Sequence, residues 1–187
     1  IPGLQTSIER DEFFDIVNKY GIAVIGQSGN LVPADKKLYA LRDVTATVDC
    51  IPLIASSIMS KKLAAGSDAI VLDVKTGSGA FMKTVEDSRK LAEKMVSIGT
   101  MAGRKCCAVI TNMDIPLGHA VGNSLEVMEA IETLKGNGPA DLTAVCLELA
   151  ANMLYMAGKG SLEECRKLAE GAMADGSALD SLANMVK

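Results

Sequence analysis

Three side chains of complementary chemistry, Arg42, Ser57 and Lys61, stand on two neighbouring predicted helices. Ser57 and Lys61 are four residues apart, so they share one face of their helix. Arg42 lies on the preceding helix, from which it can converge on the same place. A guanidinium, a hydroxyl and an ammonium together suit a planar ligand with carbonyl oxygens, and they stabilise negative charge that develops on it. The alternative is that all three lie on solvated helix faces.

A second candidate is the loop DIPLGHAVG, residues 114–122, which leaves the end of a predicted strand. Its carbonyl oxygens, together with a carboxylate from the next helix, Glu126 or Glu129, would hold a hard cation. The alternative is a plain surface loop. The single histidine, His119, has no acidic partner at an obvious spacing, so we expect it on the surface.

The third candidate is the glycine-rich segment TGSGAF, which follows the strongest predicted strand. Ligands of open α/β sheets gather at such strand ends, and glycines let backbone amides approach an anion. A phosphate-binding loop of the Walker type would need a second glycine where Met82 stands, and a dinucleotide fingerprint would need a third glycine. The alternative is a tight strand-to-helix turn that lines a cleft.

The elements that position these residues alternate between strand and helix. Apolar runs predict strands at 22–26, 68–75 and 105–111, and the helix between the last two makes a βαβ unit with parallel strands. The sequence therefore predicts an α/β fold with a mainly parallel sheet flanked by helices. Helical periodicity predicts helices at 7–20, 33–43, 49–65, 85–98, 124–134, 140–156 and 162–174, and a last helix from 178.

Composition excludes several classes of function. The 187 residues carry a net charge of −4 and no Trp, which leaves neither a basic field for nucleic acid nor a platform for stacking bases. No apolar run approaches the roughly 18–20 residues of a membrane span. The five cysteines show no CxxC spacing, and we interpret them as small buried hydrophobic residues in a reducing cytoplasm. The expected location is cytoplasmic.

The segment from Leu38 to Thr84, LYALRDVTATVDCIPLIASSIMSKKLAAGSDAIVLDVKTGSGAFMKT, strongly resembles pyrimidine-nucleoside phosphorylases. The segments GQSGNLVPADK before it and MDIPLGHAVGNSLEVMEAIETLKG after it fit as well, so the resemblance covers essentially the whole chain. These enzymes catalyse the reversible phosphorolysis of uridine- or thymidine-type nucleosides to free base and (deoxy)ribose 1-phosphate. The resemblance therefore implies a pentosyltransferase with a pyrimidine nucleoside and phosphate as its substrates.

The resemblance also assigns roles to residues. The family's base-binding arginine, serine and lysine match Arg42, Ser57 and Lys61, whose hydrogen bonds would favour the anionic leaving base. Bacterial members resemble potassium-binding proteins, and the ligands in this half fall on the backbone carbonyls of Leu117 and Ala120 and the carboxylate of Glu129. The resemblance thus selects Glu129 over Glu126, and potassium as the cofactor.

The domain map follows from the same resemblance. Residues 34–65 would belong to a small helical domain that binds the base, part of which is inserted here, and residues 1–33 and 66–187 to an incomplete α/β domain on the phosphate side. Family enzymes are longer, so we expect their phosphate motif before Ile1, a further domain after Lys187, an inactive fragment and a homodimeric whole enzyme. The alternatives are an enzyme like anthranilate phosphoribosyltransferase or a non-catalytic pyrimidine-binding module.

Overall fold

The computed structural model describes residues 1–26 and 32–186 of the chain. The described residues fall into two compact units. Unit 1 comprises those within Ile1–Asn30, Gly118–Leu147 and Lys167–Lys187, and unit 2 comprises those within Leu31–Leu117 and Glu148–Arg166. The predicted loop at Ser28, Gly29 and Asn30 lies outside the described residues.

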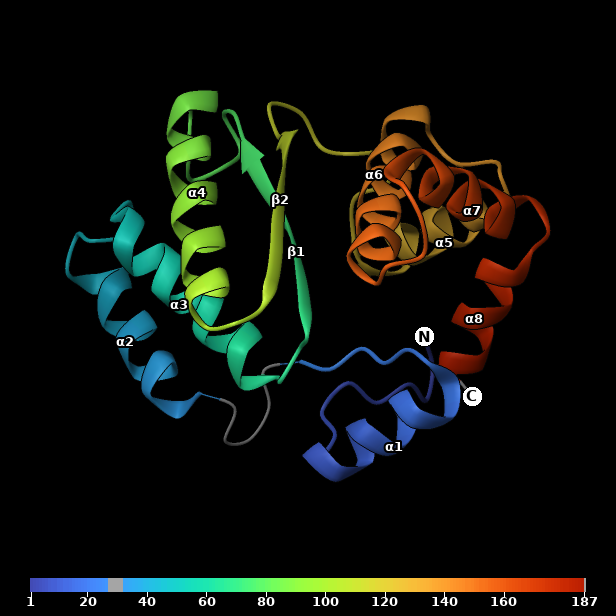
Figure 1. Ribbon diagram of the computed structural model, residues 1–187, viewed down its shortest axis with the longest axis horizontal. Helices are drawn as coiled ribbons and strands as arrows, with labels where there is room; N and C mark the ends of the chain where they lie inside the picture. The colour runs from blue at the N-terminus through green and yellow to red at the C-terminus, as the bar shows by residue number, and fades with distance from the viewer. Residues whose placement is uncertain (27–31, 187) are drawn as a thin grey trace. The chain divides into compact units, whose positions relative to one another are not determined.

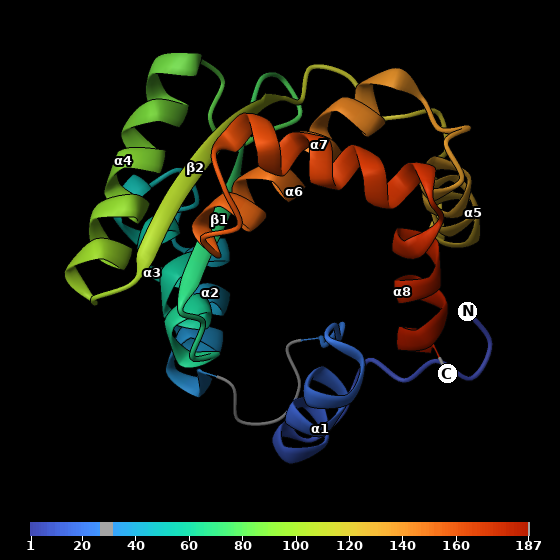
Figure 2. The same ribbon diagram turned by 45° about the vertical axis from the view of Figure 1, so that its right-hand side comes forward.

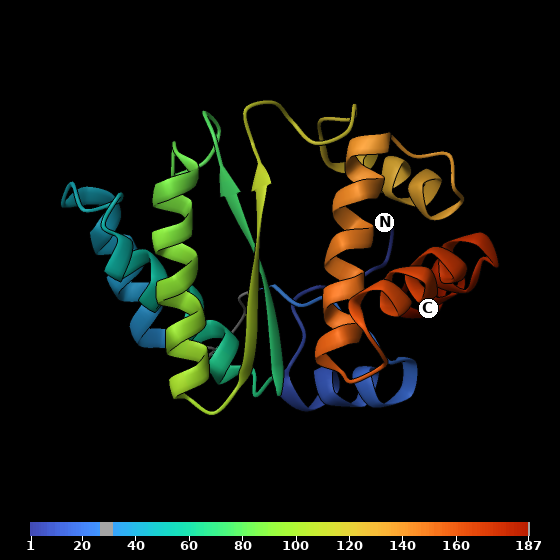
Figure 3. The same cartoon turned by 45° about the horizontal axis from the view of Figure 1, so that its top comes forward.

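Unit 2 is built around a βαβ motif (Figure 1). Strand β1 (Ala69–Thr76) and strand β2 (Lys105–Asn112) pair in parallel, in register from Ala69 opposite Lys105 to Thr76 opposite Asn112. Helix α4 (Val85–Met101) connects them, and Figure 3 shows it running alongside both strands. The α/β class and the parallel pairing predicted from the sequence are confirmed.

One face of this sheet is buried, because side chains of β1 alternate between a covered and a less covered face. Helix α3 (Ile51–Ala64) packs against α4, and α4 packs against both strands. Their apolar side chains form one core, whose buried members are Ile54, Ala55, Met59, Ile70, Leu72, Val74, Met82, Leu91, Ala92 and Met95. This core fixes the place of α3, which carries two of the three predicted base-binding residues.

Helix α2 (Pro33–Val44) precedes α3, and both helices have proline in the first turn, where the missing N–H costs no hydrogen bond. The predicted N-cap of α3 at Asp49 is wrong. Cys50 holds that position and no side chain caps the helix, because the chain enters the first turn one residue later than expected. Gly66, with φ of 79°, follows the end of α3 as predicted.

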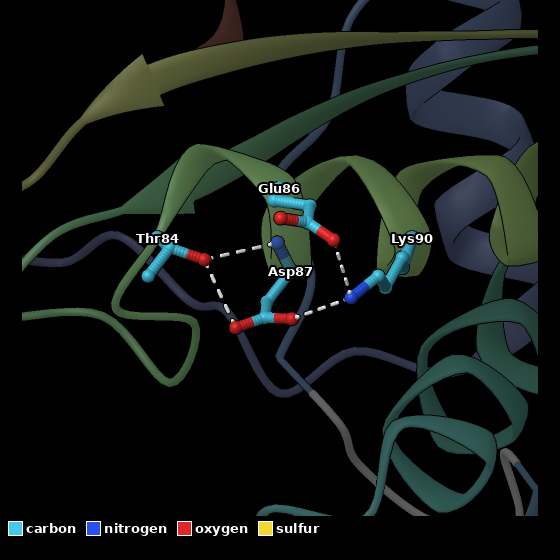
Figure 4. A network of polar contacts seen from close by, with 4 residues as sticks. All are labelled: Thr84, Glu86, Asp87 and Lys90. Carbon is cyan, nitrogen blue, oxygen red and sulfur yellow. Dashed lines mark hydrogen bonds and ion pairs between the residues drawn. The ribbon is translucent and has the colours of Figure 1, made fainter.

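The start of α4 is closed by its own side chains (Figure 4). Thr84 is the N-cap, and its Oγ1 accepts a hydrogen bond from the Asp87 N–H at 3.1 Å while it donates to Asp87 Oδ2 at 2.9 Å. Lys90 pairs with Glu86 at 2.9 Å and with Asp87 at 3.2 Å. The Asp87 N–H, which has no partner within the helix, is thus satisfied by the Thr84 side chain. Glu86 and Asp87 lie in the first turn, where the helix dipole favours acidic groups.

Unit 1 is helical in its described part. Helix α8 (Ser177–Val186) contacts α1 (Arg10–Tyr20) and α5 (Asn123–Leu134), and Figure 2 shows α8 beside α5. The remaining helices, α6 (Ala140–Met156) and α7 (Leu162–Ala174), run from one unit into the other. Their bounds coincide with the predicted ones.

The predicted strand at 22–26 is wrong, because these residues form neither strand nor helix. Val24 is 53% exposed, and the Gly26 N–H donates to the Thr6 carbonyl at 2.8 Å. An apolar run becomes a strand only when a neighbouring strand takes up its backbone hydrogen bonds, and β1 and β2 pair with each other in the other unit.

The cysteines agree with the prediction only in part. Cys165 is fully buried, Cys50, Cys106 and Cys107 are half-buried, and Cys146 is exposed, so the expectation that all are buried is wrong. Burial raises the pKa of the Cys106 and Cys107 thiols. All five are free thiols. Among the described helices, none is both long and apolar enough to cross a membrane.

The two units are defined by contacts between residues. Residues 34–65 belong to unit 2, together with the βαβ motif. The predicted division into a helical base-binding domain and an α/β domain, in contrast, is a division by role. That division stays a prediction.

Candidate functional site

A cluster of polar side chains is formed by residues of α2 and α3. Arg42 is 5% exposed and Ser57 is 8% exposed, so neither lies on a solvated helix face. Lys61 donates a hydrogen bond to the Ser57 hydroxyl at 3.0 Å and to the Ser57 carbonyl at 3.2 Å. The structure thus joins Ser57 and Lys61 directly, as their spacing on α3 predicts.

An acidic residue completes this cluster. Asp35, on the first turn of α2, is buried, and its Oδ2 lies 2.7 Å from Lys61 Nζ. Burial raises the pKa of Asp35, but polar contacts with Lys61 and Ser57 and the positive charges of Lys61 and Arg42 outweigh it and hold the pKa below the ordinary value of 3.8. Asp35 is therefore a carboxylate at neutral pH.

Aromatic rings hold the two cations in place. The Arg42 guanidinium lies over the Tyr39 ring at 4.5 Å, and Lys61 Nζ lies 5.6 Å from the centre of the same ring. Phe81, from the turn that follows β1, lies 5.9 Å from the Arg42 guanidinium. Stacking on a ring keeps the planar guanidinium in one orientation while its edge stays available for hydrogen bonds.

The cluster borders a pocket of about 160 Å³. Its polar lining comes from Asp35, Arg42 and Ser57 of the cluster and from Thr45, Thr47 and Ser56. The leucines Leu38, Leu41 and Leu53 supply an apolar wall. Two buried polar atoms of the cluster, Asp35 Oδ2 and Arg42 Nε, have no aligned hydrogen bond among the described residues. Asp35 Oδ2 is compensated by the ion pair with Lys61, whereas Arg42 Nε is left as a donor without an acceptor. The arrangement suits a small ligand with oxygen acceptors.

Sequence reasoning found Arg42, Ser57 and Lys61 but missed Asp35, Tyr39 and Phe81. The signal for two of these was present, because Asp35, Tyr39 and Arg42 stand at positions i, i+4 and i+7 of one helix and so share a face. Nothing local connects Phe81 to them, since it comes from the turn after β1.

The TGSGAF turn uses its own amides. The Ser78 N–H donates to Asp114 Oδ1 at 2.8 Å, and the Gly79 N–H donates to the Met113 carbonyl at 2.9 Å. A Cβ on Gly77 would lie 2.6 Å from Asp114 Oδ1, so glycine permits this close approach. Amides that are already paired offer no cradle for a phosphate, which favours the interpretation as a strand-to-helix turn.

The Glu129 carboxylate is enclosed by the loop that precedes its helix. Its Oε1 accepts hydrogen bonds from the His119 N–H at 2.9 Å and the Ala120 N–H at 3.1 Å. Its Oε2 has no hydrogen-bond or ion-pair partner among the described residues, and it lies where a Cβ on Gly118 would be. Predicted ligands Ala120 and Glu129 thus meet within unit 1, while Leu117 belongs to unit 2.

Two further acidic groups border this loop. The Gly118 N–H donates to Asp141 Oδ2 at 3.0 Å, and this bond and that from the Leu142 backbone lower the pKa of Asp141. Glu126 accepts from the Gly122 N–H at 3.0 Å. Carboxylate oxygens fit a hard, oxygen-binding cation such as potassium. In the described part of the chain, no three His, Cys, Asp or Glu side chains gather as a metal-binding group, and His119 is exposed as predicted.

Comparison with models of protein families identifies the family of the chain. Residues 1–179 match the model of the glycosyl transferase family, a/b domain. The chain belongs to this family. It is thus a glycosyl transferase family a/b domain in which the α2–α3 cluster provides the polar pocket.

Curated relatives share most of its sequence. A protein named "Pyrimidine-nucleoside phosphorylase" from Geobacillus stearothermophilus is 64% identical over 182 residues, which is 97% of this chain and 42% of the relative. Proteins of the same name from Staphylococcus haemolyticus and Bacillus subtilis are 60% and 58% identical, over 96% and 100% of the chain. The resemblance to pyrimidine-nucleoside phosphorylases is confirmed. The chain spans somewhat over two fifths of the length of these relatives.

Proposed function

We propose that the protein carrying this chain is a pyrimidine-nucleoside phosphorylase, and that the cluster of Arg42, Ser57 and Lys61 binds the base. The observation that supports this most directly is a buried guanidinium, Arg42, whose Nε has no acceptor among the described residues and which borders a pocket beside Ser57. The names of relatives at 58–64% identity support the same function.

In the proposed reaction, a phosphate oxygen forms a bond to the anomeric carbon while the bond from that carbon to the base nitrogen breaks. The electron pair of the broken bond goes to the base, which leaves as an anion and is protonated by solvent. Negative charge therefore grows on the ring nitrogen and the carbonyl oxygens of the base. Donors aimed at those atoms stabilise the transition state more than the substrate, which is the condition for catalysis.

The residues divide this task by their chemistry. Arg42 offers a planar fork, which its stacking on Tyr39 holds in one orientation, and so it suits a carbonyl and a neighbouring ring atom. Lys61 contributes a positive charge next to the Ser57 hydroxyl, with which it shares a hydrogen bond. The Lys61–Ser57 hydrogen bond and the stacking of Arg42 on Tyr39 hold these groups in position, so little reorganisation is needed when the base binds.

The direct test is phosphate-dependent release of base. The protein with its full chain is incubated with uridine or thymidine, with and without phosphate, and free base and pentose 1-phosphate are separated by chromatography. We expect release only with phosphate. Turnover that requires phosphoribosyl diphosphate and an aromatic amine would instead indicate an enzyme like anthranilate phosphoribosyltransferase. Binding of uracil in a thermal-shift assay without any turnover would indicate a pyrimidine-binding module.

Potassium is the proposed cofactor, with Glu129 and the carbonyls of Leu117 and Ala120 as its ligands in this part of the protein. Two observations support a cation here: Glu129 Oε2 has no partner among residues 1–26 and 32–186, and a second carboxylate, Asp141, binds the same loop through the Gly118 N–H. Potassium would supply a positive charge beside the Glu129 carboxylate. The residues themselves already orient this loop through the two amides bound by Glu129.

A homodimer in the cytoplasm is the proposed state of the whole protein. Three apolar residues on α2 support an interface, since Leu38, Leu41 and Val44 are 64%, 56% and 79% exposed. Exposed apolar side chains on one helix favour burial against a partner. Light scattering on the protein with its full chain measures the mass, and a monomer at micromolar concentration would contradict the proposal.

A further inference from the structure

Asp35 forms an ion pair with one member of the base-binding cluster and is influenced by the charge or polarity of the others. Its carboxylate lies 2.7 Å from Lys61 Nζ, and Ser57 and Arg42 are among the groups that lower its pKa. Its side chain is only 9% exposed, whereas that of Lys61 is 29% exposed. A buried carboxylate is costly unless it is paired, so the position of Asp35 depends on these partners.

The same contacts determine where Lys61 lies. A lysine has a flexible four-carbon stem, and its ammonium takes one position only when a partner fixes it. Here two cations, Arg42 and Lys61, lie 4.5 and 5.6 Å from one ring, that of Tyr39. The negative charge of Asp35, which interacts with both cations, offsets the repulsion between these like charges. Buried ion pairs contribute little net stability, so a positioning role explains the residue better than a stabilising one.

We propose that Asp35 is a positioning residue of the base-binding site. Its carboxylate holds the Lys61 ammonium, which is hydrogen-bonded to the Ser57 hydroxyl, in the arrangement that meets the pyrimidine. This inference rests on the proposed phosphorylase function. Asp35 does not touch the base in this scheme. It acts through Lys61 and Ser57, so its removal lowers the rate of the chemical step more than it weakens substrate binding.

The first experiment compares Asp35→Asn with Asp43→Asn in the protein with its full chain. Asparagine keeps the shape of the side chain and removes the charge. Asp43 is an exposed acidic residue on the same helix, so its variant is the matched control. For uridine phosphorolysis we expect kcat of Asp35→Asn to fall about 10- to 100-fold, by analogy with the loss of residues that orient the ligands of a metal ion. KM should change much less, and Asp43→Asn should match the wild type.

A double-mutant cycle then separates positioning from folding. In the background of Lys61→Met, the Asp35→Asn change should lower kcat far less than in the wild type, because the group it positions is gone. Equal losses in both backgrounds would overturn the inference, since a structural defect acts regardless of Lys61. If Asp35→Asn does not fold, Asp35→Glu, which keeps the charge and moves it by one methylene, is measured in the same two backgrounds with the same criterion.

The outcomes also distinguish this inference from the proposed function. A wild-type protein without phosphorolysis overturns both. A wild-type protein that is active, together with an Asp35→Asn variant of unchanged kcat, overturns the inference alone and leaves the base-binding roles of Arg42, Ser57 and Lys61 standing.

Discussion

The α2–α3 cluster and the Glu129 loop both gather charged groups, but they satisfy them differently. Glu129 is held by amides nine and ten residues earlier in the chain, so its hydrogen bonds are local. The cluster instead joins side chains from two helices and a distant turn, and it leaves Arg42 Nε buried with no acceptor in the part of the chain that the structure describes. Hydrogen bonds between Glu129 and the loop before its helix are explained by the structure of that loop, and they require no ligand. A buried donor that the described protein does not satisfy points to a ligand, which makes the cluster the stronger candidate for binding.

The largest expected effect tests the cluster at Arg42. The change Arg42→Lys keeps the positive charge but removes the planar fork, so kcat for phosphorolysis should fall about 10²- to 10³-fold, or roughly 2.7–4 kcal/mol, as for a lost oxyanion donor. Steady-state kinetics on the protein with its full chain measures this loss.

The control for this variant is Arg89→Lys, at an exposed position on α4. It should retain wild-type activity. Near-normal turnover of a folded Arg42→Lys protein would contradict the role of the guanidinium. The cluster would then be no stronger a candidate for a binding site than the Glu129 loop.

The second prediction tests the loop as a cation site. A bound ion present at about 100 times its Kd raises the free energy of unfolding by about 2.7 kcal/mol. Glu129→Gln keeps an acceptor for the two amides but removes the charge, so it should lose the stabilisation that potassium chloride gives the wild type. Thermal unfolding in potassium chloride and in choline chloride of equal ionic strength measures the difference.

Glu126→Gln is the matched control on the same helix, since Glu126 also accepts a loop amide, from Gly122. It should keep the response to potassium. If Glu129→Gln responds to potassium as the wild type does, the loop is explained by its local hydrogen bonds alone, and the contrast with the cluster sharpens.

A third, smaller effect measures what purely local contacts contribute in unit 2. Thr84→Ala removes the N-cap of α4 (Figure 4), which should cost about 1 kcal/mol of unfolding free energy. Urea unfolding followed by circular dichroism measures the loss. Thr84→Ser, which keeps the hydroxyl, should retain most of the stability, and a full loss in this variant would contradict the capping role.

The smallest expected effect concerns pH. The pKa of Asp35 is lowered on folding below its ordinary value of 3.8, so the folded state binds fewer protons there than the unfolded state. Its contribution to stability is therefore present above the unfolded pKa and disappears as the pH falls through the folded pKa. The stability difference between wild type and Asp35→Asn should shrink as the pH falls below 3.8. Urea unfolding across this range checks it, and a difference that grows toward low pH would contradict the ion pair.

Local patterns explain most of the successful predictions. Helical periodicity and strand–helix–strand alternation are properties of neighbouring residues, so α6, α7 and the parallel pair were predictable from the sequence. The spacing of Ser57 and Lys61 likewise determined that they meet on one face. What failed depended on distant partners. The run 22–26 has strand character but pairs with no strand among the described residues, and Cys146 lies on a helix face that is exposed.

The sequence alone therefore determined the α/β class, the family resemblance and the identity of the base-binding candidates, because these depend on residue types and short spacings. Only the tertiary structure decided that Asp35 pairs with Lys61, that Phe81 approaches Arg42 and that the amides of the TGSGAF turn are already taken. These facts follow from the packing of α2 on α3, and of α3 and the turn on one core, which brings together charges far apart in the chain. A binding site differs from a solvated helix face in the burial of its polar side chains and in the charged groups near them, rather than in residue type.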